Sequence, residues 1–190
     1  MVNERIKNVI ERSQNLSREK QILFCLILAR RLYPNYAHFQ RLQNFGDTRI
    51  LQACFAAAEE AFFNLPSGNF DKLREELLLV SPDTGDFPNE VGASYALDAC
   101  AICDAILCLI DENASDSTKR AVNLTIETAY VYSLETGEWE DHMPLENSPT
   151  ILREVEYLEQ LVSKITISDF AEVRDLASAE NFQVSNIGLS

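Results

Sequence analysis

The sequence predicts an all-α protein: one compact bundle of about nine helices around a buried central helix at roughly residues 91–111. Apolar residues recur at spacings of three and four along nearly the whole chain, and sustained two-residue alternation is absent. Residues 93–110 are apolar on almost every face, so a helix there has to be surrounded by protein. A chain of 190 residues can bury such a core as a single domain, here residues 1–190 with a short polar tail at 181–190.

The first three helices follow from amphipathic spacing, capping residues and one proline. Residues 2–12 have an amphipathic pattern, and Ser17 is placed to cap a second helix. Pro34 is expected to end that second helix, because the residue before a proline avoids helical geometry. Asn35 then caps a third helix, which closes at Phe45-Gly46.

Capping signals also locate the later helices. Asp47 caps the fourth helix, Ser115 begins the long helix before an acidic loop, and Ser148-Pro149 is a cap followed by proline at the first helical position. Ser168 caps the last helix. The six helices from the fourth onward are predicted at residues 48–64, 70–80, 91–111, 115–135, 148–164 and 168–180.

The apolar central helix is close in length to a membrane span, and the sequence argues against that alternative. A span needs about 20 apolar residues, and an aspartate near its middle costs roughly 2.5–3.5 kcal/mol on insertion scales. Asp98 and Asp104 therefore favour a helix inside a soluble protein. The first residues alternate charged and apolar types and lack the apolar region of a signal peptide, so we expect a cytoplasmic protein without membrane contact.

The five cysteines are predicted to be free thiols of the core. Their number is odd and all five lie within apolar helical stretches, which is typical of a reducing compartment. Cys100 and Cys103 form a C-x-x-C pattern, but it falls in mid-helix with no strand before it, unlike a thioredoxin-type site. Zinc is disfavoured as well, because the chain has no second ligand pair at a suitable spacing.

Charge is distributed unevenly along the chain. Residues 1–46 carry eight Lys and Arg against three Asp and Glu, a net of +5. Residues 47–190 carry eight against 27, a net of −19, so the whole chain has a net charge of −14. An acidic body repels nucleic acid over most of its surface and favours a basic protein as partner.

No motif of a known catalytic or cofactor site is present. The two histidines, His38 and His142, have no G-x-S-x-G or H-E-x-x-H context, and the six glycines form no phosphate-binding loop. Inward E-x-x-H pairs of di-iron bundles are absent too. We therefore predict no catalytic residue, no metal and no cofactor, which favours a protein that is not an enzyme.

At two places in the sequence, polar side chains occur where a buried, apolar position is expected. Asp98 must be paired if it is buried, and its expected partner is Arg30, Arg31 or a free backbone N–H at another helix start. The stretch from Arg31 to Phe39 is predicted to be an aromatic helix corner, and a packing role is favoured over a recognition corner with exposed Tyr33, Tyr36 and His38. The alternative is a pocket formed by Asp98, Tyr33 and Tyr36, and the wider set of structural or pocket candidates is Asp98, Tyr33, Asn35, Tyr36 and Asp47.

Four short motifs resemble a known family. They are Arg31-Leu32-Tyr33-Pro34-Asn35-Tyr36-Ala37, Asn44-Phe45-Gly46-Asp47, Tyr95-Ala96-Leu97-Asp98-Ala99-Cys100 and Ser185-Asn186-Ile187-Gly188. In this order they resemble the YjaG-type family of bacterial proteins, a family of unknown function, from about residue 18 to residue 188. This chain has Tyr95-Ala96 where the family's pattern carries a proline. The resemblance implies a compact all-helical cytoplasmic protein and supplies no activity, cofactor or catalytic residue.

The function we expect is non-enzymatic binding of another protein through an acidic surface. The predicted interface is the acidic loop around Trp139, since an exposed aromatic among charges is a usual anchor of an interface. Its candidate residues are Glu135, Glu138, Trp139, Glu140 and Asp141. One concrete version is an inhibitor or immunity-type protein that covers a basic nuclease or toxin, and a homodimer is left open. The rival function is a small-molecule-binding or enzymatic domain with its pocket at Asp98.

Overall fold

The computed structural model describes residues 1–63, 70–112, 114, 116–140, 142–168, 172 and 185–189. Within these residues the fold is all-helical, as predicted, with seven α-helices, one short 3-10 helix and no strand. The helices are α1 (Val2–Gln14), α2 (Arg18–Gln43), α3 (Thr48–Phe63), α4 (Asp71–Val80), α5 (Val91–Glu112), α6 (Ser117–Glu135) and α7 (Pro149–Ile167), with η1 (Leu145–Asn147) before α7.

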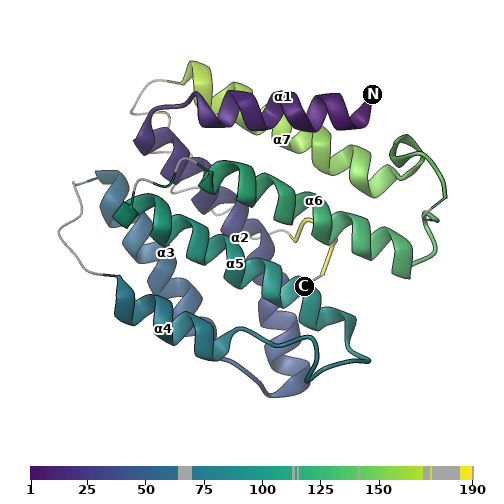
Figure 1. The fold of residues 1–190 in the computed structure, drawn as a ribbon, viewed down its shortest axis with the longest axis horizontal. Helices are drawn as coiled ribbons and strands as arrows, with labels where there is room; N and C mark the ends of the chain where they lie inside the picture. Colours follow the sequence, from purple (N-terminus) through teal and green to yellow (C-terminus); the bar gives the residue numbers. More distant parts are fainter. Residues whose placement is uncertain are drawn as a thin grey trace.

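Two helices, α2 and α5, form the centre of the bundle. They make the most extensive contact of any helix pair, with α1 and α7 on one side, α3 and α4 on the other, and α6 alongside α5 (Figure 1). The apolar run Ile22–Ala29 of α2 is buried at every residue. The sequence predicted one central helix at 91–111; the structure has that helix and a second central helix, α2, beside it.

Helix α5 contains the one stretch within the described residues that is long and apolar enough to cross a membrane, Gly92–Asp111. Within an 18-residue apolar window of that stretch, 72% of the residues are buried inside the protein. The other helices cover the apolar surface of α5. This burial explains why α5 can have so few polar side chains.

The predicted break at Pro34 is wrong, because α2 continues through this residue to Gln43. A proline inside a helix removes one backbone hydrogen bond and costs about 3 kcal/mol. Leu32, Tyr36 and Phe39, on both sides of the proline, are almost fully buried against the core. Their packing holds the helix together where the local preference would end it.

That continuity explains part of the difference between seven helices and the expected nine. The second and third predicted helices are one helix, α2. The last predicted helix, 168–180, falls largely outside the described residues, as does Ser115, where the long helix before the acidic loop is predicted to begin.

Three predicted caps are confirmed. The Ser17 side chain accepts a hydrogen bond from the backbone N–H of Lys20, and the Ser148 side chain accepts one from Ile151. The Asp47 carboxylate accepts one from the backbone N–H of Arg49 at 2.9 Å. These bonds satisfy donors that a helix start leaves without an intrahelical partner.

Candidate functional site

The aromatic corner is a packing feature and Tyr36 is its buried centre. The Tyr36 hydroxyl donates to the backbone carbonyl of Val80 at 2.9 Å and accepts from the backbone N–H of Asp47 at 3.0 Å. Burial raises the pKa of Tyr36 well above its ordinary value. Tyr33 lies nearer the surface, where its hydroxyl accepts from the Gln52 side chain at 2.9 Å. The Tyr36 hydroxyl therefore connects α2 to the loop that precedes α3 and to the end of α4.

Gly46 is required at this corner for two reasons. Its φ is +88°, a conformation that other residues rarely adopt, and a Cβ there would collide with the Tyr36 hydroxyl. We expect Gly46→Ala to lower the free energy of unfolding by about 2–3 kcal/mol, measured by urea denaturation. Gly137 is the matched control, because its φ is +69° and nothing lies within 4 Å of the added Cβ. Equal losses in the two variants would contradict the role of the Tyr36 contact.

Asp98 is buried, with 7% of its surface exposed, but the predicted arginine partners are wrong. Its carboxylate accepts a hydrogen bond from the Thr128 hydroxyl on α6 at 2.7 Å. Arg30 instead pairs with Glu59 and Arg31 with Glu154, because Asp98 faces α6. Burial raises the pKa of Asp98 to about 7, and the nearby Glu127 carboxylate adds to the shift.

The most buried ion pair in the described part of the chain joins Arg31 and Glu154, and sequence reasoning missed it. The Glu154 side chain is 0% exposed and receives two hydrogen bonds from the guanidinium, at 3.2 and 2.9 Å. The same guanidinium lies 3.9 Å from the centre of the Tyr157 ring. The signal was present: Glu154 falls between Ile151 and Leu158 at helical spacing, so it lies on the apolar face of α7.

Trp139 does not project from the acidic loop, so the predicted exposed anchor is wrong. The residue is 3% exposed, its indole N–H donates to the Pro144 carbonyl at 3.0 Å, and its ring packs against Tyr130. The loop closes over its own tryptophan because burial of the indole and this hydrogen bond are both favourable.

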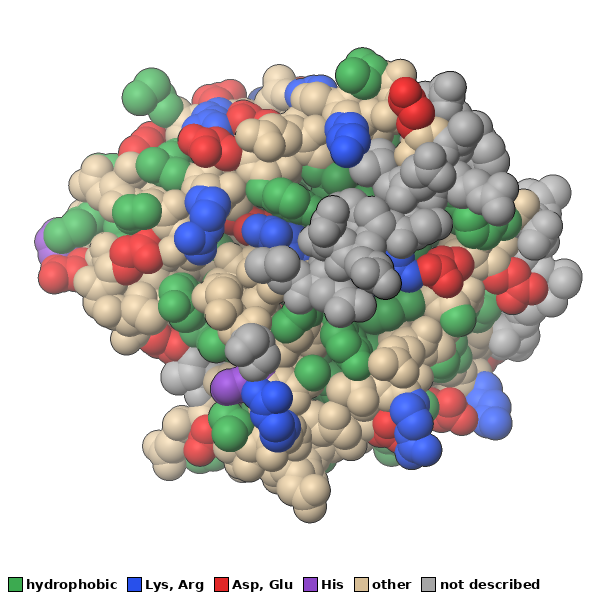
Figure 2. Space-filling view, turned by 180° about the vertical axis from the view of Figure 1, so that it is seen from behind, with side chains coloured by type: hydrophobic (Ala, Val, Ile, Leu, Met, Phe, Trp, Pro, Cys, Tyr) green, Lys and Arg blue, Asp and Glu red, His purple; other side chains and the backbone are tan. Residues whose placement is uncertain are grey.

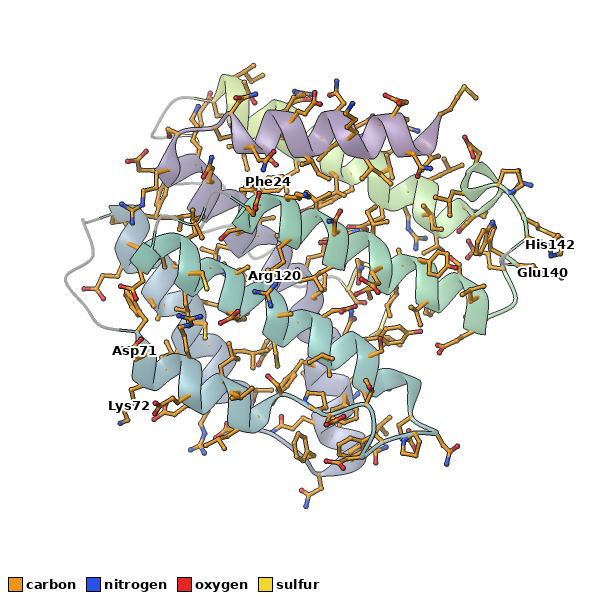
Figure 3. The ribbon with its side chains drawn as sticks, viewed as in Figure 1. Phe24, Asp71, Lys72, Arg120, Glu140 and His142 are labelled. Carbon is orange, nitrogen blue, oxygen red and sulfur yellow. The ribbon has the colours of Figure 1, made fainter. Side chains whose placement is uncertain are left out.

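The acidic residues of that loop have structural partners. The Glu138 carboxylate accepts hydrogen bonds from the backbone N–H and hydroxyl of Thr150, each at 2.7 Å, and so caps the start of α7. Burial opposes its ionisation, but the hydrogen bonds from Thr150 and Ser148 outweigh burial, so the pKa of Glu138 is lowered. Glu135 accepts from the Tyr95 hydroxyl at 2.5 Å. Glu140 lies 3.4 Å from His142, at the end of the molecule away from α4 (Figure 3), and Asp141 lies outside the described residues.

Several of the basic residues near the N-terminus form ion pairs with acidic ones. Arg5 pairs with Glu159, Arg30 with Glu59 and Arg31 with Glu154. On the face opposite that of Figure 1, Lys and Arg are interspersed with Asp and Glu (Figure 2). The net charge of +5 over residues 1–46 therefore does not become a basic patch on that face.

A groove of about 520 Å³ opens between α4, α5 and α6. Its apolar wall includes Leu77, Leu97 and Ala101. Asp104 on α5 accepts from Arg74 on α4 at 3.2 Å and from Arg120 on α6 at 2.8 Å, so it connects the three helices. Arg120 extends from α6, and Asp71 marks the start of α4 at the edge of the molecule (Figure 3).

Helix α4 is the least buried of the seven. Leu77 is the one residue of its ten that is buried. The next two residues, Leu78 and Leu79, are 75% and 78% exposed, and Leu78 lines the groove. Neither leucine was among the interface residues predicted from the sequence. The run Leu77-Leu78-Leu79 in an otherwise charged helix was the available signal, since one helix face cannot bury three consecutive residues.

The buried thiols are poor nucleophiles. Burial raises the pKa of Cys25 and of Cys100 to about 12, so both remain protonated at neutral pH. Cys103 is also buried, which confirms the predicted core position of the C-x-x-C pattern. Among the residues that the structure describes, no group of three or more His, Cys, Asp and Glu side chains is arranged to hold a metal ion.

Comparison with known proteins gives a family and a fold. The family described as "Protein of unknown function (DUF416)" matches residues 8–190. The chain belongs to the DUF416 family. A solved structure similar to this DUF416 member is the crystal structure of a DUF416 family protein from Shewanella baltica OS155, with 22% sequence identity and a TM-score of 0.84. The match covers 95% of this chain and 97% of that one, and no curated protein matches. A family of unknown function is thus confirmed, and the YjaG-type name stays a prediction.

In this DUF416 member, the motifs that suggested a family contact one another. Tyr36 of the first motif binds Asp47 of the second, and Asn35 of the first binds Ser185 and Asn186 of the fourth. Asp98 of the third motif faces a different element, α6. Asp98 therefore contacts α6, whereas Tyr36 contacts Asp47 and Val80. In the described structure the predicted pocket residues do not line one common cavity.

Proposed function

We propose that this protein is a non-enzymatic, cytoplasmic binding module that docks a basic protein segment on α4 and the loop after it. The observation that carries the proposal is the adjacent pair Leu78 and Leu79, exposed beside the groove. An inhibitor or immunity-type role toward a basic protein fits such a surface and belongs to the same proposal.

Apolar exposure supports this choice of surface. A single exposed leucine is ordinary on a protein surface, whereas a contiguous exposed apolar patch marks a candidate interaction site. Leu78 lines the groove and Leu79 is exposed next to it, so both extend the apolar surface at this place. The groove offers a partner side chain the apolar contacts of Leu77, Leu97 and Ala101. Burial of both leucines against a partner would remove the largest exposed apolar area of α4 from water.

Charge supports a basic partner. Residues 71–90 carry six Asp and Glu against two Lys and Arg, a net of −4. Asp83, Asp86 and Glu90 are exposed in the loop directly after α4. An acidic field of this kind raises the association rate of a basic partner and disfavours an acidic one.

The test begins with a photo-crosslinking residue at position 79 in cells that produce the protein, with position 167 as control. Ile167 is 83% exposed but lies at the end of α7, on the other side of the bundle from α4 (Figure 1). We expect position 79 to capture a basic protein that position 167 does not capture. Capture of a second copy of this chain would contradict a basic partner and indicate a homodimer.

Binding of the purified partner then decides the proposal. We expect Leu78→Ser with Leu79→Ser to weaken binding at least about tenfold, because the variant removes the apolar anchors. Ile167→Ser should leave the dissociation constant unchanged, and added salt should slow association. The proposal would be overturned by a partner whose dissociation constant changes neither in the double leucine variant nor with added salt.

A further inference from the structure

The segment Ser185–Leu189 packs against residues that are far from it in the sequence. Ser185, Asn186 and Ile187 are all buried, between α2 and α6 (Figure 1). Two of these three residues are polar, so they need hydrogen-bond partners there.

The polar side chains of this segment bind Asn35 and α6. Asn35 Nδ2 donates to Asn186 Oδ1 at 3.1 Å, and Ser185 Oγ donates to Asn35 Oδ1 at 2.6 Å. Asn186 Nδ2 donates to the backbone carbonyl of Thr125 at 3.2 Å. We call the Asn35 side chain and the Thr125 carbonyl the polar slot. An empty slot would leave the buried amide of Asn35 without these partners, which is unfavourable for a buried polar group.

Hydrogen bonds within the segment stabilise its local conformation. The Ser185 side chain accepts from the backbone N–H of Ile187 at 3.1 Å, and the Ser185 carbonyl accepts from Gly188 at 3.3 Å. These bonds form a turn within the segment, independent of α2 and α6. The three contacts with the slot come from only two side chains, with Ile187 buried next to them.

We infer that the polar slot is a peptide-binding site for a Ser-Asn sequence followed by an apolar residue. Its ligand in this structure is the chain's own segment Ser185–Ile187, and the same sequence supplied on a separate peptide is a ligand too. The recognition is chemical: the slot requires a carboxamide that both donates and accepts, and a hydroxyl one residue before it. This inference does not depend on the docking surface at α4.

The test measures binding of a fluorescent peptide with the sequence of residues 183–190 to the full-length chain. In the wild-type protein the tethered segment competes at high effective concentration, so we expect weak peptide binding. Asn186→Ala removes two of the three bonds of the tethered segment and should strengthen peptide binding at least about tenfold. Adding Asn35→Ala to that variant, or Asn to Ala at the same position in the peptide, should abolish the gain. The Leu78→Ser with Leu79→Ser variant should bind the peptide as weakly as wild type.

Two results would overturn the inference. The first is a helical Asn186→Ala protein that binds the peptide no better than wild type. The second is a gain in binding that Asn35→Ala does not remove. If Asn186→Ala does not fold by itself, the peptide present during refolding should restore its helical circular dichroism, and no restoration would contradict the inference equally.

Discussion

Glu154→Ala is expected to lower the free energy of unfolding by about 3–5 kcal/mol. The substitution leaves the Arg31 guanidinium beneath α7 without the carboxylate that now accepts two hydrogen bonds from it. Burial raises the pKa of Glu154 even beside Arg31, so desolvation works against its charge. The loss comes from the unpaired charge rather than from any large net stability of the pair. Urea denaturation followed by far-UV circular dichroism measures it.

A surface pair on the same helix is the control. Glu159 pairs with Arg5 at 2.7 Å, but both side chains are about one-third exposed. Glu159→Ala should therefore cost less than about 1 kcal/mol. Replacing both buried partners, Arg31→Met with Glu154→Leu, should recover most of the stability that Glu154→Ala loses, since neither charge remains buried. A double variant as unstable as Glu154→Ala would contradict this explanation.

Asp98→Asn is expected to change how stability depends on pH. The pKa of Asp98 is about 7 in the folded protein, above its ordinary value of 3.8. A raised pKa means that the folded state holds this proton more tightly, so the contribution is present at low pH and is lost as pH rises towards 7. Each unit of pKa difference corresponds to about 1.4 kcal/mol, and Asp98 is half ionised at pH 7, so wild type should lose about 2 kcal/mol relative to Asp98→Asn between about pH 5 and pH 7.

Unfolding curves of the two proteins across this pH range measure that difference in stability. The contributions of the other titrating groups are nearly the same in both proteins, so they largely cancel in the difference. Thr128→Val is the companion variant. The Thr128 hydroxyl donates to the carboxylate and lowers the pKa of Asp98, so its removal should extend the pH-dependent loss to higher pH. Parallel stability curves for wild type and Asp98→Asn would show that Asp98 does not titrate in this range.

The fold class and most helix positions were predictable because their signals are local. Capping at Ser17, Asp47 and Ser148 acts within three residues of a helix start, and the sequence shows it directly. The apolar surface of α5 likewise required a core position whichever helices surround it. Burial of Asp98 followed from its place on that helix.

The partners of the buried polar groups were not predictable in the same way. Asp98 meets Thr128 and Arg31 meets Glu154, pairs that are 30 and 123 residues apart. Helical periodicity shows that a side chain points inward, but it does not show which helix lies opposite. The incorrect interface prediction at Trp139 has the same cause. The composition of the acidic loop does not show that its tryptophan folds back and bonds to the Pro144 carbonyl.

Local patterns alone therefore determined an all-helical chain with a buried central helix, several capped helix starts and the inward position of Asp98. The continuity of α2 through Pro34, the Arg31–Glu154 pair, the occupied slot at Asn35 and the exposed leucines of α4 depended on how the helices pack. The physical reason is the sequence distance over which each interaction acts. Hydrogen-bond capping and helical spacing act over three or four residues. Packing energy comes from segments distant in the sequence, and at Pro34 it exceeds a local preference of about 3 kcal/mol.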